Sequence, residues 1–493
     1  MRIDWQKGES SGGLPVYQQI AGAVREAIAS QGLGSGHRLP TIRDLASQLG
    51  VHRDTIATAY ESLASEGVIE SAVGRGTFVA DAGLESSTAT SFTPVLAPAV
   101  ERLMAFERAR PRFGIARDAI ALHALVPDPS LYPADAFRKA FNRALVQGGP
   151  ELLLYGSPEG HPGLRETLAA RMTAASLPVS AEDLVLCHGA SQGIALALRL
   201  FCAPGDVVAL EEPTYNNVLG AALALGLRTT PVPMRDDGVD LAALEATLAR
   251  PEVKAFYTMP TFHNPLGTTT SLAHRRRLLD IAQQTKVPVI EDGYEMDLRF
   301  AGQAASPLAG LDPSGSVVHL FSFSKSLFPG ARVGAISARG RLRDALLALK
   351  QASDLSDALP LQAALAEFVG CGEYDRHLGR LRPVLRQRRD ALLEALAKYL
   401  PEGSRWTEPE GGYQVWVELG GDLDTRDLLA DAVAAGVLFA PGAQFHHDGR
   451  RSSGMRLTFA MADEKRLEAG VERLARVLDA HRRGGNATAN APV

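Results

Sequence analysis

Cysteine is scarce in this chain, and long apolar runs are missing. Cys187, Cys202 and Cys371 are the only three cysteines in 493 residues, and no two stand at a metal-ligand spacing. This excludes a disulfide framework and a cysteine-based zinc site, so we expect no metal. No apolar run reaches membrane-spanning length, and the first residues lack the basic and then apolar order of a signal peptide. We therefore expect a cytoplasmic protein that does not enter a membrane.

An excess of basic residues is also lacking. The formal net charge is −5, and residues 1–80 carry seven Lys and Arg against eight Asp and Glu. A uniformly basic nucleic-acid binder is excluded, so any contact with DNA must come from a local patch. With 46% hydrophobic residues, the chain is long enough for several cores, and we expect two or three domains.

The first 80 residues predict three helices followed by a hairpin. Apolar residues recur every four positions between Pro15 and Ser30, which indicates an amphipathic helix. Thr41 is placed to cap a short second helix that ends at Gly50, and a third helix is expected from about Arg53 to Ser65. Residues 68–79 read as two short strands joined by a glycine turn. The pattern is a helix-turn-helix with a wing.

This segment resembles the winged helix-turn-helix of GntR-type regulators. The matching residues are Leu39-Pro40, Arg43, Leu45-Ala46, Gly50-Val51, Arg53, Thr55, Glu66-Gly67 and Gly74-Arg75-Gly76-Thr77-Phe78-Val79. The resemblance implies binding to double-stranded operator DNA, with helix residues at the major groove and wing residues at the backbone or minor groove. The residues expected at the DNA are Arg38, Arg43, His52, Arg53, Thr55, Arg75 and Gly76. Asp54 and Ala57 depart from the family's usual residues, so the base contacts stay open.

The rest of the chain divides into a linker, an α/β domain and a tail. Residues 81–118 are rich in Ser, Thr, Ala and Pro, and we interpret them as a linker that a short helix near Pro98 to Arg108 interrupts. In residues 119–483 helical patterns alternate with short apolar strands, which predicts an α/β domain with a mainly parallel sheet. Residues 484–493 are expected to be disordered.

Polar residues at the ends of these strands suit pyridoxal phosphate, a cofactor that needs an amine, a carboxylate and a phosphate site. Lys325 can bind the aldehyde, and Asp292 can keep the pyridine nitrogen protonated. Asn264 and Tyr294 can bond the phenolate oxygen. The phosphate is expected at a glycine turn that opens a helix, with help from nearby polar side chains: Gly189-Ala190-Ser191-Gln192-Gly193, Ser322, Ser324 and Arg332.

Together these residues resemble the fold-type I aminotransferases, and their fusion to a GntR-type head resembles the MocR-type subfamily of regulators. The resemblance implies a smaller α+β subdomain over roughly residues 370–483. It also implies that Tyr215 stacks on the pyridine and that Arg456 pairs with a substrate or effector carboxylate. Tyr155 is similar to the tyrosine that reaches the neighbouring subunit's cofactor phosphate, so a homodimer is implied. Where relatives carry two acids before the tyrosine, this chain has Asp292-Gly293-Tyr294.

The sequence leads to one functional hypothesis and two alternatives. The hypothesis is a transcriptional regulator in which pyridoxal phosphate forms an aldimine with Lys325. The sensed ligand is either an amino acid-like effector that displaces Lys325 or pyridoxal phosphate itself. The first alternative is an active aminotransferase with a DNA-binding appendage, because the residues needed for amino transfer are present. The second is a DNA-binding regulator whose large domain has lost its cofactor.

Overall fold

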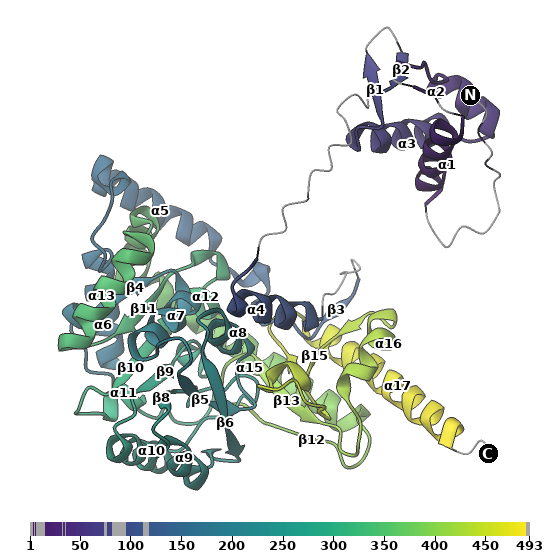
Figure 1. Ribbon diagram of the computed structural model, residues 1–493. Coiled ribbons are helices and arrows are strands. Elements are labelled where there is room, and N and C mark those ends of the chain that lie inside the picture. Colours follow the sequence, from purple (N-terminus) through teal and green to yellow (C-terminus); the bar gives the residue numbers. More distant parts are fainter. Residues whose placement is uncertain are drawn as a thin grey trace. The chain divides into compact units, whose positions relative to one another are not determined.

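Residues 1–95 and residues 96–493 form separate units in the computed structural model (Figure 1). The structure describes Ile3, Trp5 and residues 15–31, 33–34, 36–72, 76–80, 95–111 and 118–489. None of the helices in these ranges is long and apolar enough to cross a membrane.

The first unit contains the predicted helix-turn-helix. Thr41 caps the second helix, because its side chain accepts a hydrogen bond from the Asp44 N–H at 3.2 Å. Gly50 ends that helix with φ +64°, a left-handed conformation that glycine adopts at little cost. The first and second helices both pack on the third. The three helices are α1 (Val16–Ser30), α2 (Ile42–Leu49) and α3 (Arg53–Ser65).

The predicted wing is confirmed. Strands β1 (Ile69–Ala72) and β2 (Gly76–Val79) pair antiparallel, with Ile69 opposite Val79. Both of these residues are buried in a core that also contains Ile20 of α1. The wing is thus fixed to the helices through its apolar side chains, while the turn residues 73–75 lie outside the described part of the chain.

An eight-stranded sheet forms the centre of the second unit. Its order is β4-β11-β10-β9-β8-β5-β6-β7, and the pairs β10–β9, β9–β8, β8–β5 and β5–β6 are parallel. Strand β11 runs antiparallel to both of its neighbours. Because the parallel pairs outnumber the antiparallel ones, the predicted mainly parallel sheet is confirmed. The strands are β4 (Leu184–Cys187), β5 (Val207–Glu212), β6 (Arg228–Arg235), β7 (Gly238–Val239), β8 (Val253–Thr258), β9 (Val289–Asp292), β10 (Val317–Ser322) and β11 (Gly334–Ser337).

Both faces of the sheet are covered. Successive residues of β5, Val207 and Val208, enter two different apolar cores, because strand side chains alternate between faces. Helix α7 (Gly189–Phe201) packs over β10 and β11 on one face. Helices α9 (Leu241–Leu248) and α10 (Leu272–Thr285) contact each other and contribute to the core on the other face (Figure 1).

A smaller subdomain lies at the C-terminal end of the chain. Its antiparallel sheet has the order β12-β13-β16-β15, and helices α15 and α17 pack against each other. Helix α17 continues to Ala489, six residues into the segment expected to be disordered, and residues 490–493 lie outside the described ranges. The elements are β12 (Arg405–Trp406), β13 (Gln414–Glu418), β15 (Ala440–Pro441), β16 (Gly454–Thr458), α15 (Glu373–Tyr399) and α17 (Glu464–Ala489).

The helix expected inside the linker is part of the second unit. Helix α4 (Pro98–Ala109) packs against α8 (Asn216–Ala224), which follows strand β5. Pro98 stands at the first helical position, where its missing N–H costs nothing. Helix α4 is therefore the first helix of the second unit and the closest one in sequence to the DNA-reading unit.

Candidate functional site

A cavity of about 220 Å³ lies where several strands of the large sheet end. Strand β9 ends at Asp292, β10 ends at Ser322, and the turn after β4 begins helix α7, as expected for ligand sites in open α/β sheets. Ten residues predicted for the cofactor line this cavity: Ala190, Ser191, Tyr215, Asn264, Asp292, Tyr294, Ser322, Ser324, Lys325 and Arg332. Leu125, Asn217 and Pro329 complete the lining.

The start of α7 is built to hold an anion. Gly189 has φ +75°, and a Cβ atom at this position would lie 3.3 Å from the Arg332 guanidinium group. Arg332 itself adopts φ +43° and donates a hydrogen bond to the His188 carbonyl at 3.0 Å. The first-turn residues Ala190 and Ser191 border the cavity, and the N-terminal end of a helix favours negative charge.

Two serines, one at the end of strand β10 and one just after it, extend this anion site. The Ser322 hydroxyl accepts a hydrogen bond from the Ser324 N–H at 3.2 Å. The Ser324 hydroxyl is buried and has no hydrogen-bond partner among the described residues. A buried hydroxyl group without a partner costs free energy, which a phosphate oxygen in the cavity would recover.

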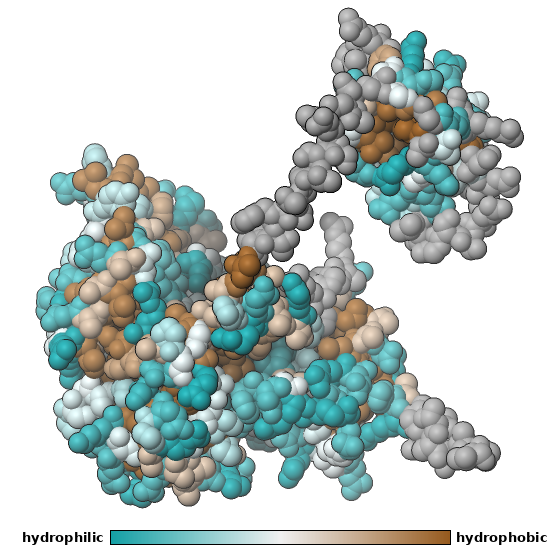
Figure 2. Space-filling model, viewed as in Figure 1, coloured by the Kyte–Doolittle hydropathy of each residue, from teal (hydrophilic) through white to brown (hydrophobic). Residues whose placement is uncertain are grey.

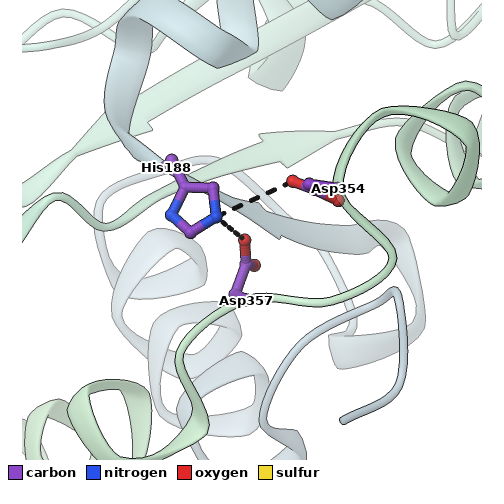
Figure 3. Close-up of side chains that lie close together, drawn as sticks. All are labelled: His188, Asp354 and Asp357. Carbon is purple, nitrogen blue, oxygen red and sulfur yellow. Dashed lines mark ion pairs between the residues drawn. The ribbon is translucent and has the colours of Figure 1, made fainter. Parts of the chain in front are cut away.

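Gln192, also predicted for the cofactor, does not line the cavity. Its amide accepts from the His188 N–H at 2.7 Å and donates to Asp354 at 2.5 Å. Figure 3 shows the His188 ring turned toward Asp354 and Asp357, with Nε2 3.1 Å from the Asp357 carboxylate. The buried Lys350 ammonium group lies 2.9 Å from both carboxylates, so these acids already have a cation between them. Through His188, this cluster holds the turn at the start of α7 where the phosphate is expected.

Asp292 is buried at the end of β9 with only one of its oxygens engaged. Its Oδ2 accepts a hydrogen bond from the Tyr257 hydroxyl at 2.7 Å, and its Oδ1 has no partner among the described residues. Burial raises the pKa of this carboxyl to about 6. A protonated pyridine nitrogen would supply the positive charge that this buried carboxylate lacks.

Lys325 lies in a buried environment that favours a neutral amine. Its Nζ donates to the Leu125 carbonyl. Burial lowers the pKa of Lys325, and the negative charge of the buried Glu295 acts in the opposite direction. Burial in turn raises the pKa of Glu295, and the charge of Lys325 opposes that shift. A neutral amine is the form that attacks an aldehyde, so the site suits the predicted role of Lys325.

Arg456 and Asn264 form a second polar group beside the cavity. Arg456 donates to the Asn264 Oδ1 and to the His123 carbonyl, both at 2.9 Å, and its guanidinium group lies 5.0 Å from the centre of the Phe445 ring. No acid forms an ion pair with Arg456 among the described residues, and burial lowers its pKa. A buried guanidinium group in this state favours a carboxylate ligand.

The rings of Tyr215 and Tyr294 lie parallel, with an interplanar angle of 1° and centroids 6.5 Å apart. The Tyr294 hydroxyl donates to the Phe262 carbonyl at 3.2 Å and accepts from Gln414 at 2.9 Å. The Asn264 Nδ2 has no partner within the described residues. Of the two groups predicted to bond the phenolate oxygen, the Asn264 amide therefore has a donor without a partner among the described residues, whereas the Tyr294 hydroxyl is already bonded.

Tyr155 stands apart from this cavity. Its side chain is 85% exposed, and neighbouring large apolar residues are exposed with it: Val146, Leu153, Leu154 and Leu355. Figure 2 shows hydrophobic residues at the surface on the side where Figure 1 labels α5 (Ala134–Gly148) and α13 (Gly340–Asp354). A group of exposed apolar side chains of this kind is typical of a protein interface.

The predicted DNA-reading residues that the structure describes lie at the start of α3, in the first turn of α2 and beside the wing. Arg43, His52 and Arg53 are exposed, and Thr55 is half-buried. His52 precedes the helix without capping it through its side chain, and its ring lies 3.2 Å from Asp54. Exposed Arg38 lies next to Gly76 of the wing, where a Cβ atom would be 3.1 Å from its Nε. Arg75 falls outside the described residues.

The sequence alone did not predict several residues that line the cavity or contact its lining. Tyr257, which donates a hydrogen bond to Asp292, stands in a short apolar run, although its hydroxyl needs a partner when buried. Asn217 stands two residues after Tyr215, and this short distance in sequence could have indicated that it lies near the cavity. Leu125 contributes a backbone carbonyl, for which no side-chain pattern exists. Glu295 follows Tyr294 directly and supplies an acid near Lys325, although the position of the second acid before the tyrosine is occupied by Gly293.

Comparison with known proteins places both units. Residues 126–474 match the family described as aminotransferase class I and II, and residues 16–79 match the bacterial regulatory proteins of the gntR family. The chain belongs to the class I and II aminotransferase family. It joins to that domain a gntR-family helix-turn-helix, which implies DNA binding, and it has the domain order of the MocR-type transcription regulators.

Three relatives illustrate the two halves of the chain. The uncharacterized HTH-type transcriptional regulator YdcR of Escherichia coli is 30% identical over 94% of this chain and 98% of its own length. The probable rhizopine catabolism regulatory protein MocR of Rhizobium meliloti is 29% identical over 94% of this chain and 93% of its own. The structure of LysN, an α-aminoadipate aminotransferase of Thermus thermophilus complexed with N-(5'-phosphopyridoxyl)-L-leucine, aligns with TM-score 0.70 and 30% identity over 78% of this chain and 95% of that one.

Pyridoxal phosphate is the cofactor of this family, and the cavity fits it. Among the described residues that line the cavity, the buried atoms without partners are an acceptor on Asp292 and two potential donors on Asn264 and Ser324. An acid, an amide and a hydroxyl group are the partners that a pyridine nitrogen, a ring oxygen and a phosphate need. The unmet hydrogen-bonding capacity of the described cavity therefore matches the polar atoms of the cofactor.

Replacing Asp292 with Asn tests this charge balance. The pKa of Asp292 in the folded protein, about 6, lies above its ordinary value, so its contribution to stability falls as pH rises from about 4 through 6. We expect cofactor-free Asp292→Asn protein to be more stable than the parent by roughly 1–3 kcal/mol at pH 7.5, with the gap closing toward pH 4. Thermal unfolding of the large unit at both pH values measures the gap.

The same variant is expected to bind pyridoxal phosphate at least about tenfold more weakly, because the ring nitrogen loses its counter-charge. Asp280→Asn, at an exposed carboxylate of α10, is the matched control and should change neither property. A variant that is less stable than the parent at pH 7.5, or that binds the cofactor equally well, would contradict the assignment.

Proposed function

We propose that this protein is a transcriptional regulator that binds operator DNA through its gntR-family head and senses a primary amine through pyridoxal phosphate held on Lys325. The proposal rests on one observation. The same chain contains a DNA-reading unit and a cavity whose buried polar atoms without partners match those that the cofactor needs. A cofactor cavity in a DNA-binding chain is best explained as a sensor, because an enzyme that only transfers amino groups would not need a DNA-binding unit.

The residues of the site divide the sensing task between them. Pyridoxal phosphate supplies an aldehyde that bonds reversibly to primary amines. Lys325 presents an amine whose pKa burial has lowered, and the serines with the α7 turn hold the phosphate. Arg456 has no acidic partner among the described residues and is free to bind the carboxylate of an amino acid-like effector. An effector amine that takes the place of Lys325 would release the lysine and alter the cavity.

Two further functions are compatible with the same site. In the first, pyridoxal phosphate is itself the sensed ligand, and loading of the cavity is the signal. In the second, the chain is an active aminotransferase. This function is favoured by Arg456, which pairs with no acid among the described residues, and by the lowered pKa of Lys325. Turnover of an amino acid with a keto acid at about 1 per second or faster would support the second.

A homodimer is part of the proposal. Tyr155 is too exposed to act on its own cavity and stands among apolar residues that water would otherwise cover. We infer that this surface, defined by Val146, Leu153, Leu154, Tyr155 and Leu355, meets a second copy of the chain, so that Tyr155 reaches the partner's phosphate site.

Lys325→Ala separates sensing from DNA binding. We expect the variant to bind operator DNA within about threefold of the parent, because the substitution lies outside the head, and to lose all response to pyridoxal phosphate and to amino acids. The operator can be selected from a random DNA library with the purified parent protein. Affinity is then measured with and without pyridoxal phosphate and a panel of amino acids.

Lys254→Ala, at an exposed lysine of β8, is the control and should respond like the parent. Persistence of the amino-acid response in Lys325→Ala would refute sensing through the lysine. Loss of operator binding by both variants would instead point to a general folding defect.

Arg53→Ala tests the reading head. Arg53 is the first residue of α3 and is exposed, a position from which helix-turn-helix proteins contact bases or phosphates. We expect operator binding to weaken by about 1–3 kcal/mol if Arg53 reads a base. If it contacts a phosphate, the slope of log affinity against log salt should fall by about 1 in magnitude. Titrations at several salt concentrations distinguish the two.

Arg25→Ala provides the comparison, because Arg25 pairs with Glu66 on the same unit. It removes the same charge and should weaken binding less. Equal effects of the two substitutions would show that only the overall charge of the head matters.

A further inference from the structure

The end of helix α4 is bonded directly to residues that line the cofactor cavity. Arg110, the residue that caps α4, donates from Nη2 to the Asn217 Oδ1 and to the Asn216 carbonyl, both at 3.2 Å. Asn217 in turn donates from Nδ2 to the Tyr215 hydroxyl at 2.6 Å. Asn217 and Tyr215 both line the cavity. A continuous set of hydrogen bonds thus runs from α4 to the cavity wall.

Arg110 is held in place by its own helix. Its guanidinium group lies 4.9 Å from the centre of the Phe106 ring, and its Nη1 pairs with Glu107 at 3.0 Å. Phe106 and Leu103 face Gly220 of α8, where a Cβ atom would meet them at ordinary contact distances of 3.6 and 3.8 Å. Arg110 therefore moves with α4, and a change at Asn217 acts on the helix as a whole.

The other side of Arg110 is not tightly packed. A second cavity of about 240 Å³ separates the end of α4 from the loop around His446 to Gly449 in the smaller subdomain. Arg110 and Arg426 border this cavity. Packed side chains move only where free volume exists, and here the free volume adjoins the end of α4.

We propose that Arg110 is a positioning residue that couples the filling of the cofactor cavity to helix α4. This proposal deepens the proposed function and rests on it, because it names how the cavity acts on the part of the chain that leads to the DNA-binding unit. Cofactor against Tyr215 restricts the tyrosine and fixes Asn217, and the Asn217 amide then fixes Arg110 and the end of α4. Without the cofactor, the weak 3.2 Å bonds leave α4 freer to open locally.

Amide hydrogen exchange read by mass spectrometry tests the coupling, with pyridoxal phosphate as the probe. In the parent protein, we expect the cofactor to slow exchange in peptides of α8 and of α4, the latter by about fivefold or more. In Arg110→Met, α8 should still be protected, while α4 should change by less than about twofold. The cofactor's affinity, measured by absorption, should stay within about threefold, because Arg110 does not touch the cavity.

Arg108→Met is the matched control, since Arg108 is an exposed residue of the same helix, and it should behave as the parent does. Arg110→Lys tests whether the Met substitution merely destabilises α4. Lysine keeps the positive charge but cannot bond both Asn216 and Asn217 in the way that the guanidinium group does. This variant should also lose the α4 response. Equal α4 protection in the parent and in both Arg110 variants, or no α4 protection in the parent while α8 is protected, would overturn the proposal.

The outcomes separate this proposal from the proposed function. If pyridoxal phosphate neither binds nor protects α8, the sensing function fails and the coupling fails with it. If α4 responds through Arg110 but operator affinity is the same with and without ligand, the coupling stands and the regulatory function is wrong.

Discussion

The burial of ionisable groups at the end of the large sheet is the constraint on which the site depends. Asp292 is buried and accepts a hydrogen bond from the Tyr257 hydroxyl, and burial lowers the pKa of Lys325. Burial shifts the pKa of each group away from its ordinary value in water, and this shift costs free energy. The eight-stranded sheet, covered on both faces, supplies the stability that offsets this cost. A bound cofactor adds further stability by supplying the charges that the buried groups lack.

The same constraint connects the cavity to its surroundings. The phosphate turn before α7 is supported by His188, whose carbonyl binds Arg332 and whose ring faces two acids held by Lys350. On the opposite side, Tyr215 is bonded through Asn217 to the end of α4. The cavity is therefore bonded to the cluster of His188, Asp354, Asp357 and Lys350 and to the helix nearest in sequence to the head.

Much of the fold could be predicted, because its signals are local. Apolar runs such as Val317–Leu320 are strands, Thr41 caps α2, and the site residues stand at strand ends, where parallel strands bring them together. Contacts between distant segments could not be predicted. The packing of α4 on α8 depends on residues more than 100 positions apart, and buried Lys350 resembles a surface lysine until its acids are placed beside it.

The most direct test of the central claim is to load the purified protein with pyridoxal phosphate, record the visible spectrum, reduce it with borohydride and locate the modified residue by mass spectrometry. We predict a visible absorption band and one phosphopyridoxyl group, on Lys325, with Lys350 and the other lysines unmodified. Reduction that leaves Lys325 unmodified, or protein that shows no absorption band at saturating cofactor, would contradict the assignment of this cavity and the sensing function built on it.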